Sequence, residues 1–154
     1  DMNLVALKEE VDHVRHYLLI QQIRYRQNFE FIIDIDERLY NLPVIKLSLQ
    51  PLVENAILHG IQPDQDFTQI RISAHALNDF LYVEVYNQGF GLTQQRILEI
   101  QHMIQSSEPS SSLGLKNVYQ RLKLYYGDAA DLLFESELDI YTKVILKMPI
   151  KKEE

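Results

Sequence analysis

The sequence has no cysteine, no excess of positive charge and no long apolar run, and each absence excludes a class of protein. Without cysteine there is no disulfide framework and no thiolate metal site, which fits a reducing compartment. The formal net charge of −7 argues against a protein that binds nucleic acid through bulk positive charge. No stretch approaches the about 20 apolar residues of a membrane span, and no signal-peptide pattern opens the sequence.

The composition that remains is that of an ordinary globular domain. Hydrophobic residues make up 46% and charged residues 24% of the 154 residues. This length predicts one compact domain with a short appendage. Residues 1–4 look like the interior of a longer protein, so we expect the sequence to be part of one. No contact with nucleic acid or membrane is expected of this part of it.

Residues 3–27 are predicted to form one long helix, with the main domain at 28–154. Apolar residues recur in it at alternating spacings of three and four, which is a heptad seam: Leu4, Leu7, Val11, Val14 and Leu18. Two interpretations of the seam stay open. It packs on its own domain, or it packs against another helix in a bundle, within or between chains.

The rest of the chain alternates strands with helices. The expected strands are 29–35, 70–76, 80–86, 132–136 and 141–148, and the expected helices are 43–59, 93–105 and 114–126. Pro43 is expected at the first helical position, and Pro51 is expected to bend or divide that helix. Because the strands come in adjacent antiparallel pairs, we predict an α+β sandwich with helices on one face of a sheet.

A first segment, residues 49–60, interrupts an apolar helix face with polar residues. Leu52, Asn55, Ala56 and His59 share that face. Burying an unpaired amide costs about 1–3 kcal/mol, so Asn55 needs a defined partner. The alternative is a satisfied core asparagine followed by a histidine at the helix end.

Two further segments combine glycine with polar residues. A strand ends at Asn87 and is followed by Gly89 and Gly91, which let the backbone approach a ligand or simply form a turn. A small polar loop, 106–112, then delivers Gly114 to a helix start, where free backbone amides make a natural phosphate site. Lys116 and Arg121 add charge there, unless both are solvated surface residues.

In this order and spacing, the three segments resemble the histidine-kinase branch of the GHKL ATPases, which also include DNA gyrase and heat-shock chaperones. Residues 54–60 are similar to the asparagine box of that family, 87–91 to its first glycine box and 112–117 to its second. The phrases QPLVENAILHG, LGLKNVYQRL and VDHVRHYLLIQQIRY most resemble LytS-like sensor kinases. The resemblance covers nearly the whole chain.

The resemblance implies a Bergerat-type fold, a two-layer sandwich with a mixed, largely antiparallel sheet, that binds ATP and Mg²⁺ beside a lid at residues 106–113. On that basis Asn55 would ligate Mg²⁺, Glu54 would support the transfer, and His59 would lie near the phosphates. Asn87 would meet the adenine. The remaining cofactor-binding residues would be Gly89, Gly91, Gly114, Leu115, Lys116 and Asn117.

The sequence departs from the family pattern at two positions. Asn87 stands where the family has aspartate, and Ser112 stands where its second glycine box begins with glycine. An asparagine amide can still pair with an adenine edge but without charge assistance, so we expect binding weaker by about tenfold.

The phosphoacceptor histidine of LytS-like kinases lies in a separate H-F-x-F-N motif, which this sequence lacks. His13 and His16 do not match it and are interpreted as surface or packing residues. The resemblance therefore implies the ATP-binding part of a histidine kinase, with the end of its dimerisation helix at 1–27 and the acceptor upstream. A response regulator, a homodimer and a cytoplasmic position in a membrane-anchored bacterial sensor are implied with it.

Two other functions remain open at this stage. One is a degenerate nucleotide-binding module that acts through dimer geometry, which the changes at Asn87 and Ser112 favour. The other is a related ATPase outside the kinases.

Overall fold

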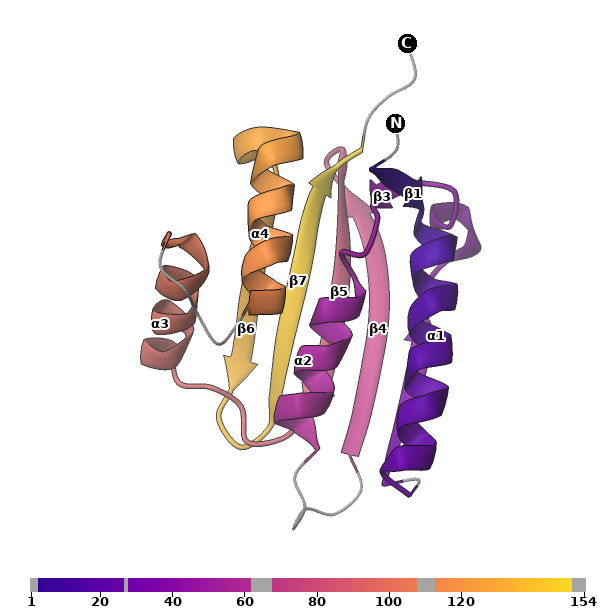
Figure 1. The fold of residues 1–154 in the computed structure, drawn as a ribbon, viewed down its shortest axis with the longest axis vertical. Coiled ribbons are helices and arrows are strands. Elements are labelled where there is room, and N and C mark those ends of the chain that lie inside the picture. Colours follow the sequence, from indigo (N-terminus) through magenta and orange to yellow (C-terminus); the bar gives the residue numbers. More distant parts are fainter. Residues whose placement is uncertain (1–2, 27, 62–67, 108–112, 151–154) are drawn as a thin grey trace.

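The computed structural model describes residues 3–26, 28–61, 68–107 and 113–150. Figure 1 shows one main sheet with α1, α2 and α4 on the same face. The strands of this sheet are β2 (Phe29–Asp34), β4 (Thr68–Leu77), β5 (Phe80–Gln88), β6 (Asp131–Glu137) and β7 (Tyr141–Pro149). The helices are α1 (Leu7–Arg24), α2 (Gln50–Gly60), α3 (Gln94–Gln105) and α4 (Leu113–Tyr126). Two 3₁₀ turns, η1 (Glu37–Leu39) and η2 (Gly127–Ala129), and two short strands, β1 (Leu4–Ala6) and β3 (Pro43–Ile45), complete the described elements.

The main sheet is mixed and largely antiparallel, in the order β2-β4-β5-β7-β6. β2 runs parallel to β4, and the other neighbouring pairs run antiparallel. The predicted α+β class, with helices on one face of the sheet, is therefore confirmed. β1 and β3 pair separately as a two-stranded antiparallel sheet.

The central strands alternate between core and outer face with the period of two that a strand imposes. In β5 the residues on the helix side are buried: Leu81, Val83, Val85 and Asn87. The turn from β4 into β5 consists of Asn78 and Asp79, with φ of +52° and +68°. Positive φ at both central residues is the type I′ geometry of a tight hairpin, so the predicted hairpin is confirmed.

The N-terminal helix is shorter than predicted. It begins at Leu7 and ends at Arg24, because residues 4–6 form β1, where Leu4 pairs with Ile45. The seam residues within the helix are 0–1% exposed and belong to the main core: Leu7, Val11, Val14 and Leu18. In this chain the seam packs on its own domain, which was the first of the two interpretations.

The predicted helix from Pro43 is wrong at its start. Pro43 opens β3, and α2 begins only at Gln50, so Pro51 lies in its first turn and does not divide it. The first turn tolerates proline because its N–H groups have no partner within the helix. The correct start depends on the pairing of β3 with β1, which the local sequence does not reveal.

The ends of α3 and α4 agree with the prediction. Thr93 caps α3, with its Oγ1 accepting from the backbone N of Arg96 at 3.1 Å. α4 ends at Tyr126, where Gly127 adopts a φ of +67°. Most of the predicted lid, 108–112 with Ser112, lies outside the described residues. No helix in the described ranges combines the length and the apolarity needed to cross a bilayer.

Candidate nucleotide site

The C-terminal end of α2 meets the end of β5 at Asn87. A Cβ placed on Gly60 would lie 2.7 Å from Nδ2 of Asn87, and a Cβ on Gly89 would lie 3.8 Å from Cα of Gly60. Glycine at position 60 therefore lets the last turn of α2 rest directly on the asparagine side chain. Asn87 is 4% exposed, and its Nδ2 donates to the carbonyl of Gln88 at 3.2 Å. Its carbonyl oxygen, Oδ1, has no partner among the described residues.

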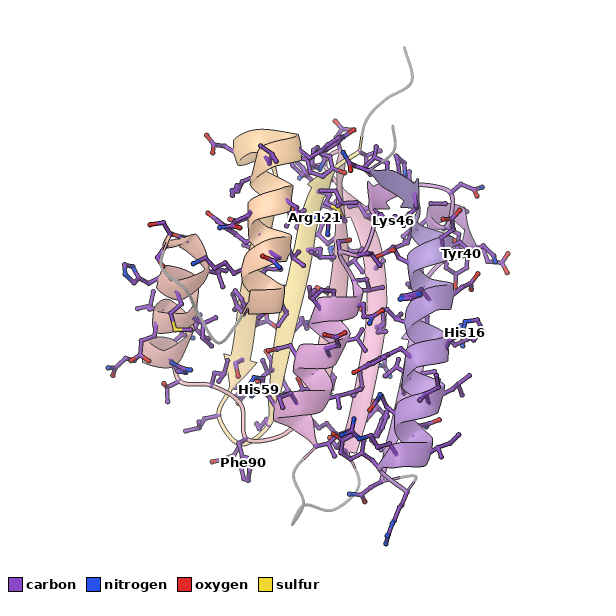
Figure 2. The ribbon with its side chains drawn as sticks, viewed as in Figure 1. His16, Tyr40, Lys46, His59, Phe90 and Arg121 are labelled. Atoms are coloured by element: carbon purple, nitrogen blue, oxygen red, sulfur yellow. The ribbon has the colours of Figure 1, made fainter. Side chains whose placement is uncertain are left out.

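The polar residues of α2 lie on the helix that ends at this junction. Asn55 is half-buried, and its side chain has no hydrogen-bond partner within the described part of the chain. Glu54 is exposed and accepts from Nε2 of Gln50 at 2.8 Å. His59 lies in the last turn of α2, toward the loop that carries Phe90 (Figure 2). A half-buried amide without a partner among the described residues keeps its donor and acceptor open to water or to a ligand.

His59 is held toward its neutral form. Shielding of the ring from water lowers its pKa, and the positive charge of Arg96 on α3 lowers it further. A neutral imidazole still donates one hydrogen bond, but it brings no charge to a phosphate. His59 is therefore suited to orienting a ligand more than to neutralising it.

The first glycine segment is held against the turn between β6 and β7. Gly91 has a φ of +69°, and a Cβ on it would lie 2.3 Å from the carbonyl oxygen of Glu137. Around it, Asp139 N donates to Phe90 O at 2.6 Å and Leu92 N donates to Ser136 Oγ at 2.6 Å. Gly91 is therefore required by the close approach of two backbones, whatever it contributes to a ligand pocket.

The second glycine segment begins α4 beside the first turn of α2. A Cβ on Gly114 would meet only the Cβ of Pro51, at an ordinary 3.5 Å. Nothing in the described chain excludes a side chain there. Leu115 and Lys116 are each 5% exposed, whereas Asn117 is exposed. The structure thus brings the starts of α2 and α4 together and places Asn87 and Gly89 at the other end of α2.

Within the described ranges, the donor set suits a metal shared with a ligand rather than a metal held by protein side chains alone. Across the described ranges, no three His, Asp or Glu side chains come together as a metal site. Mg²⁺ is commonly held by one or two protein oxygens together with substrate phosphates. The amide oxygen of Asn55, with the carboxylate of Glu54 one residue away, provides ligands of that kind.

Two residues that hold α2 in place were assigned differently or missed by the sequence reasoning. Arg121 was left as a phosphate ligand or a surface residue, but its guanidinium donates to the carbonyls of Lys46 and Leu47 (Figure 2). Glu10 was not singled out, although it is 4% exposed and accepts from backbone N–H groups just before α2. An acidic residue at a buried helix position was the only available signal, and its partner lies 38 residues away.

This arrangement, with three helices on one face of a mixed sheet and α2 meeting β5 and α4, is the fold of a histidine kinase catalytic domain. The catalytic domain of histidine kinase ThkA superimposes on it with a TM-score of 0.72, covering 97% of each chain at 20% identity. The Acinetobacter baumannii histidine kinase AdeS gives a TM-score of 0.68 over 97% of this chain and 67% of its own, at 14% identity.

The sequence relatives are sensor histidine kinases. The chain is 33% identical to sensor histidine kinase YesM of Bacillus subtilis over 98% of its length, and 34% identical to YpdA of Escherichia coli over 83%. It is 29% identical to the sensor protein LytS of Bacillus cereus over 96%. No family model matches the chain. The chain spans about a quarter of the length of these curated relatives.

Sequence and fold therefore agree. The chain is a homologue of the LytS, YesM and YpdA sensor histidine kinases over nearly its whole length, and it has the fold of their class of catalytic domain.

Proposed function

We propose that this chain is the ATP-binding catalytic part of a sensor histidine kinase, which transfers the γ-phosphate of ATP to a histidine elsewhere in the same protein. The observation that carries the proposal is the half-buried side chain of Asn55, unpartnered among the described residues, on the helix that joins Asn87 to the first turn of α4. The homology to sensor histidine kinases supports the same reaction.

In this proposal each part of the site acts on a different part of the nucleotide. Asn87 Oδ1 accepts from the adenine amine at the end of β5. Asn55, with Glu54 beside it, would offer its amide oxygen to Mg²⁺, which would supply charge neutralisation for the phosphates, and His59 donates to a phosphate oxygen. The first turn of α4, from Gly114 to Asn117, offers backbone N–H groups to the phosphates. Phosphoryl transfer depends mostly on positioning and charge neutralisation, so such donors are sufficient chemistry.

The acceptor, the partner and the setting belong to the proposal as well. A solved complex of histidine kinase ThkA with response regulator protein TrrA has a TM-score of 0.68 to this chain at 17% identity. We propose a response regulator as the recipient of the phosphoryl group, a homodimer as the complete kinase, residues 1–27 as the end of its dimerisation region, and a cytoplasmic position for this domain in a membrane-anchored bacterial sensor.

Titration of ATP by calorimetry, with and without Mg²⁺, tests the proposal. Asn55→Ala should weaken ATP binding in Mg²⁺ by about tenfold or more, since a metal ligand is lost, and change binding in EDTA much less. Asn41→Ala, which alters an exposed asparagine in the turn before β3, is the matched control and should change neither. Equal losses with and without metal would mean that Asn55 is structural. Absence of nucleotide binding by the unaltered chain would favour a degenerate module, as the asparagine at position 87 does.

A further inference from the structure

The first turn of α2 lacks a capping residue of its own. Its N-cap is Leu49, which makes no side-chain capping bond, and Pro51 follows in the first turn. The first N–H groups of a helix need acceptors when they are buried. Within α2, Leu52 N donates to Leu49 O at 3.1 Å, but the N–H groups of Ser48 and Leu49, just before the helix, take their acceptor from another element.

Glu10, in the first turn of α1, supplies that acceptor. Its Oε1 accepts from Ser48 N at 3.0 Å and from Leu49 N at 3.2 Å, and its side chain is 4% exposed. A buried carboxylate at a helix N-terminus is stabilised by the helix dipole and by charge-assisted hydrogen bonds. These two hydrogen bonds to the Glu10 carboxylate join α1 to the start of α2.

Arg121 of α4 holds the same segment by its carbonyls. The guanidinium donates to Lys46 O and, at 3.3 Å, to Leu47 O. Leu47 has a φ of +61°, a conformation that residues with a side chain rarely adopt. Residues 46–49 are therefore held through their carbonyls by α4 and through their N–H groups by α1.

This segment leads directly into the helix that carries the proposed metal ligand. Asn55 lies six residues after Leu49, about 9 Å along the helix axis. The first turn of α4, with Gly114, touches the first turn of α2 at Pro51. A shift of residues 46–49 therefore changes the position of Asn55 relative to the first turn of α4.

We propose that Glu10 is a positioning residue for the phosphoryl transfer, and that it makes the placement of α2 depend on the position of α1. This inference rests on the proposed function. It adds that the metal and phosphate ligands keep their spacing only while the Glu10 carboxylate occupies the start of α2. A displacement of α1 then alters nucleotide geometry without any contact between α1 and the nucleotide.

The test compares Glu10→Gln with Glu9→Gln, its exposed neighbour on the same helix. Glutamine keeps the shape and an acceptor oxygen but removes the charge. We expect Glu10→Gln to speed hydrogen exchange of the amides at 48–49 and to weaken ATP binding in Mg²⁺ by about fivefold. ATP binding in EDTA should change less than twofold. Glu10→Asp, which restores the charge on a shorter side chain, should recover part of the Mg²⁺-dependent affinity, and Glu9→Gln should change nothing.

Two results would overturn the inference. One is a lower melting temperature of Glu10→Gln with the ratio of affinities in Mg²⁺ and EDTA unchanged, because that would make Glu10 a stabilising residue only. The other is unchanged exchange at 48–49. Failure of the unaltered chain to bind ATP would contradict the proposed function instead, and the exchange measurement would still report whether Glu10 holds the start of α2.

Discussion

Substitution by alanine should have a different effect at each of three glycines, because the structure gives each a different reason for lacking a side chain. Gly91 combines a φ of +69° with a backbone carbonyl 2.3 Å from the position of a Cβ. Gly127 has nearly the same φ, +67°, but no atom within 4 Å of that position. Gly114 has no positive φ, and its Cβ would make an ordinary contact.

The magnitudes follow from these geometries. Gly127→Ala should lower the free energy of unfolding by about 1–2 kcal/mol, the cost of a left-handed backbone for a residue with a Cβ. Gly91→Ala should lose the same 1–2 kcal/mol for its backbone conformation. It should lose about 1–3 kcal/mol more because the β6–β7 turn must move by about 1 Å to reach a normal carbon–oxygen distance. Gly114→Ala should change stability by less than about 1 kcal/mol, and alanine is the better helix former.

Urea unfolding measures the stability of all three variants, and nucleotide titration of the folded variants measures their ATP affinity. In a thermal melt, Gly91→Ala should lower the melting temperature by roughly 4–20 °C, since its cost of about 2–5 kcal/mol corresponds to about 2–4 °C per kcal/mol for a chain of this size. Gly114→Ala should instead keep its stability and lose ATP affinity, because the methyl group stands where phosphates would approach. Equal destabilisation by Gly91→Ala and Gly127→Ala would refute the close approach to Glu137. A loss of stability in Gly114→Ala as large as in Gly91→Ala would refute a ligand as the reason for that glycine.

Three further predictions concern charge and phosphoryl transfer. Asn87→Asp should tighten adenine nucleotides about fivefold, or about 1 kcal/mol, and leave guanine nucleotides unaffected in the same titration; unchanged or weaker ATP binding would place Asn87 outside the adenine pocket. Because the pKa of His59 lies below the ordinary 6.5 in the folded chain, the unfolded chain takes up the proton more readily, so stability falls as pH drops below 6.5. His59→Gln should remove part of that fall in urea titrations at pH 5 and 8, and an identical pH dependence would contradict it. The 154-residue chain should bind ATP without labelling itself from γ-labelled ATP, and acid-labile label that disappears in His13→Ala or His16→Ala would disprove this.

Much of the fold follows from local patterns in the sequence. The alternation of β5 and the Asn78–Asp79 turn identify a hairpin, since period two and a type I′ turn are short-range properties. The cap at Thr93 and the glycine after Tyr126 likewise mark the ends of helices from their own residues. The three polar segments and their order are also visible in the sequence, and so is the resemblance to histidine kinases that rests on them.

Other features depend on contacts between distant parts of the chain. Residues 4–6 and 43–45 form strands only because they pair with each other, so local periodicity assigned both to helices. The seam of α1 has the same spacing whether it faces its own core or another helix, and only the packed structure shows it buried in this domain. Glu10 was not singled out in the sequence and Arg121 was left open between two roles, because their partners lie 38 and 75 residues away. The sequence by itself determined the three polar segments from which we predict a nucleotide site. Only the tertiary structure decided what holds α2 at its start, because hydrogen bonds over such separations leave no periodic signal.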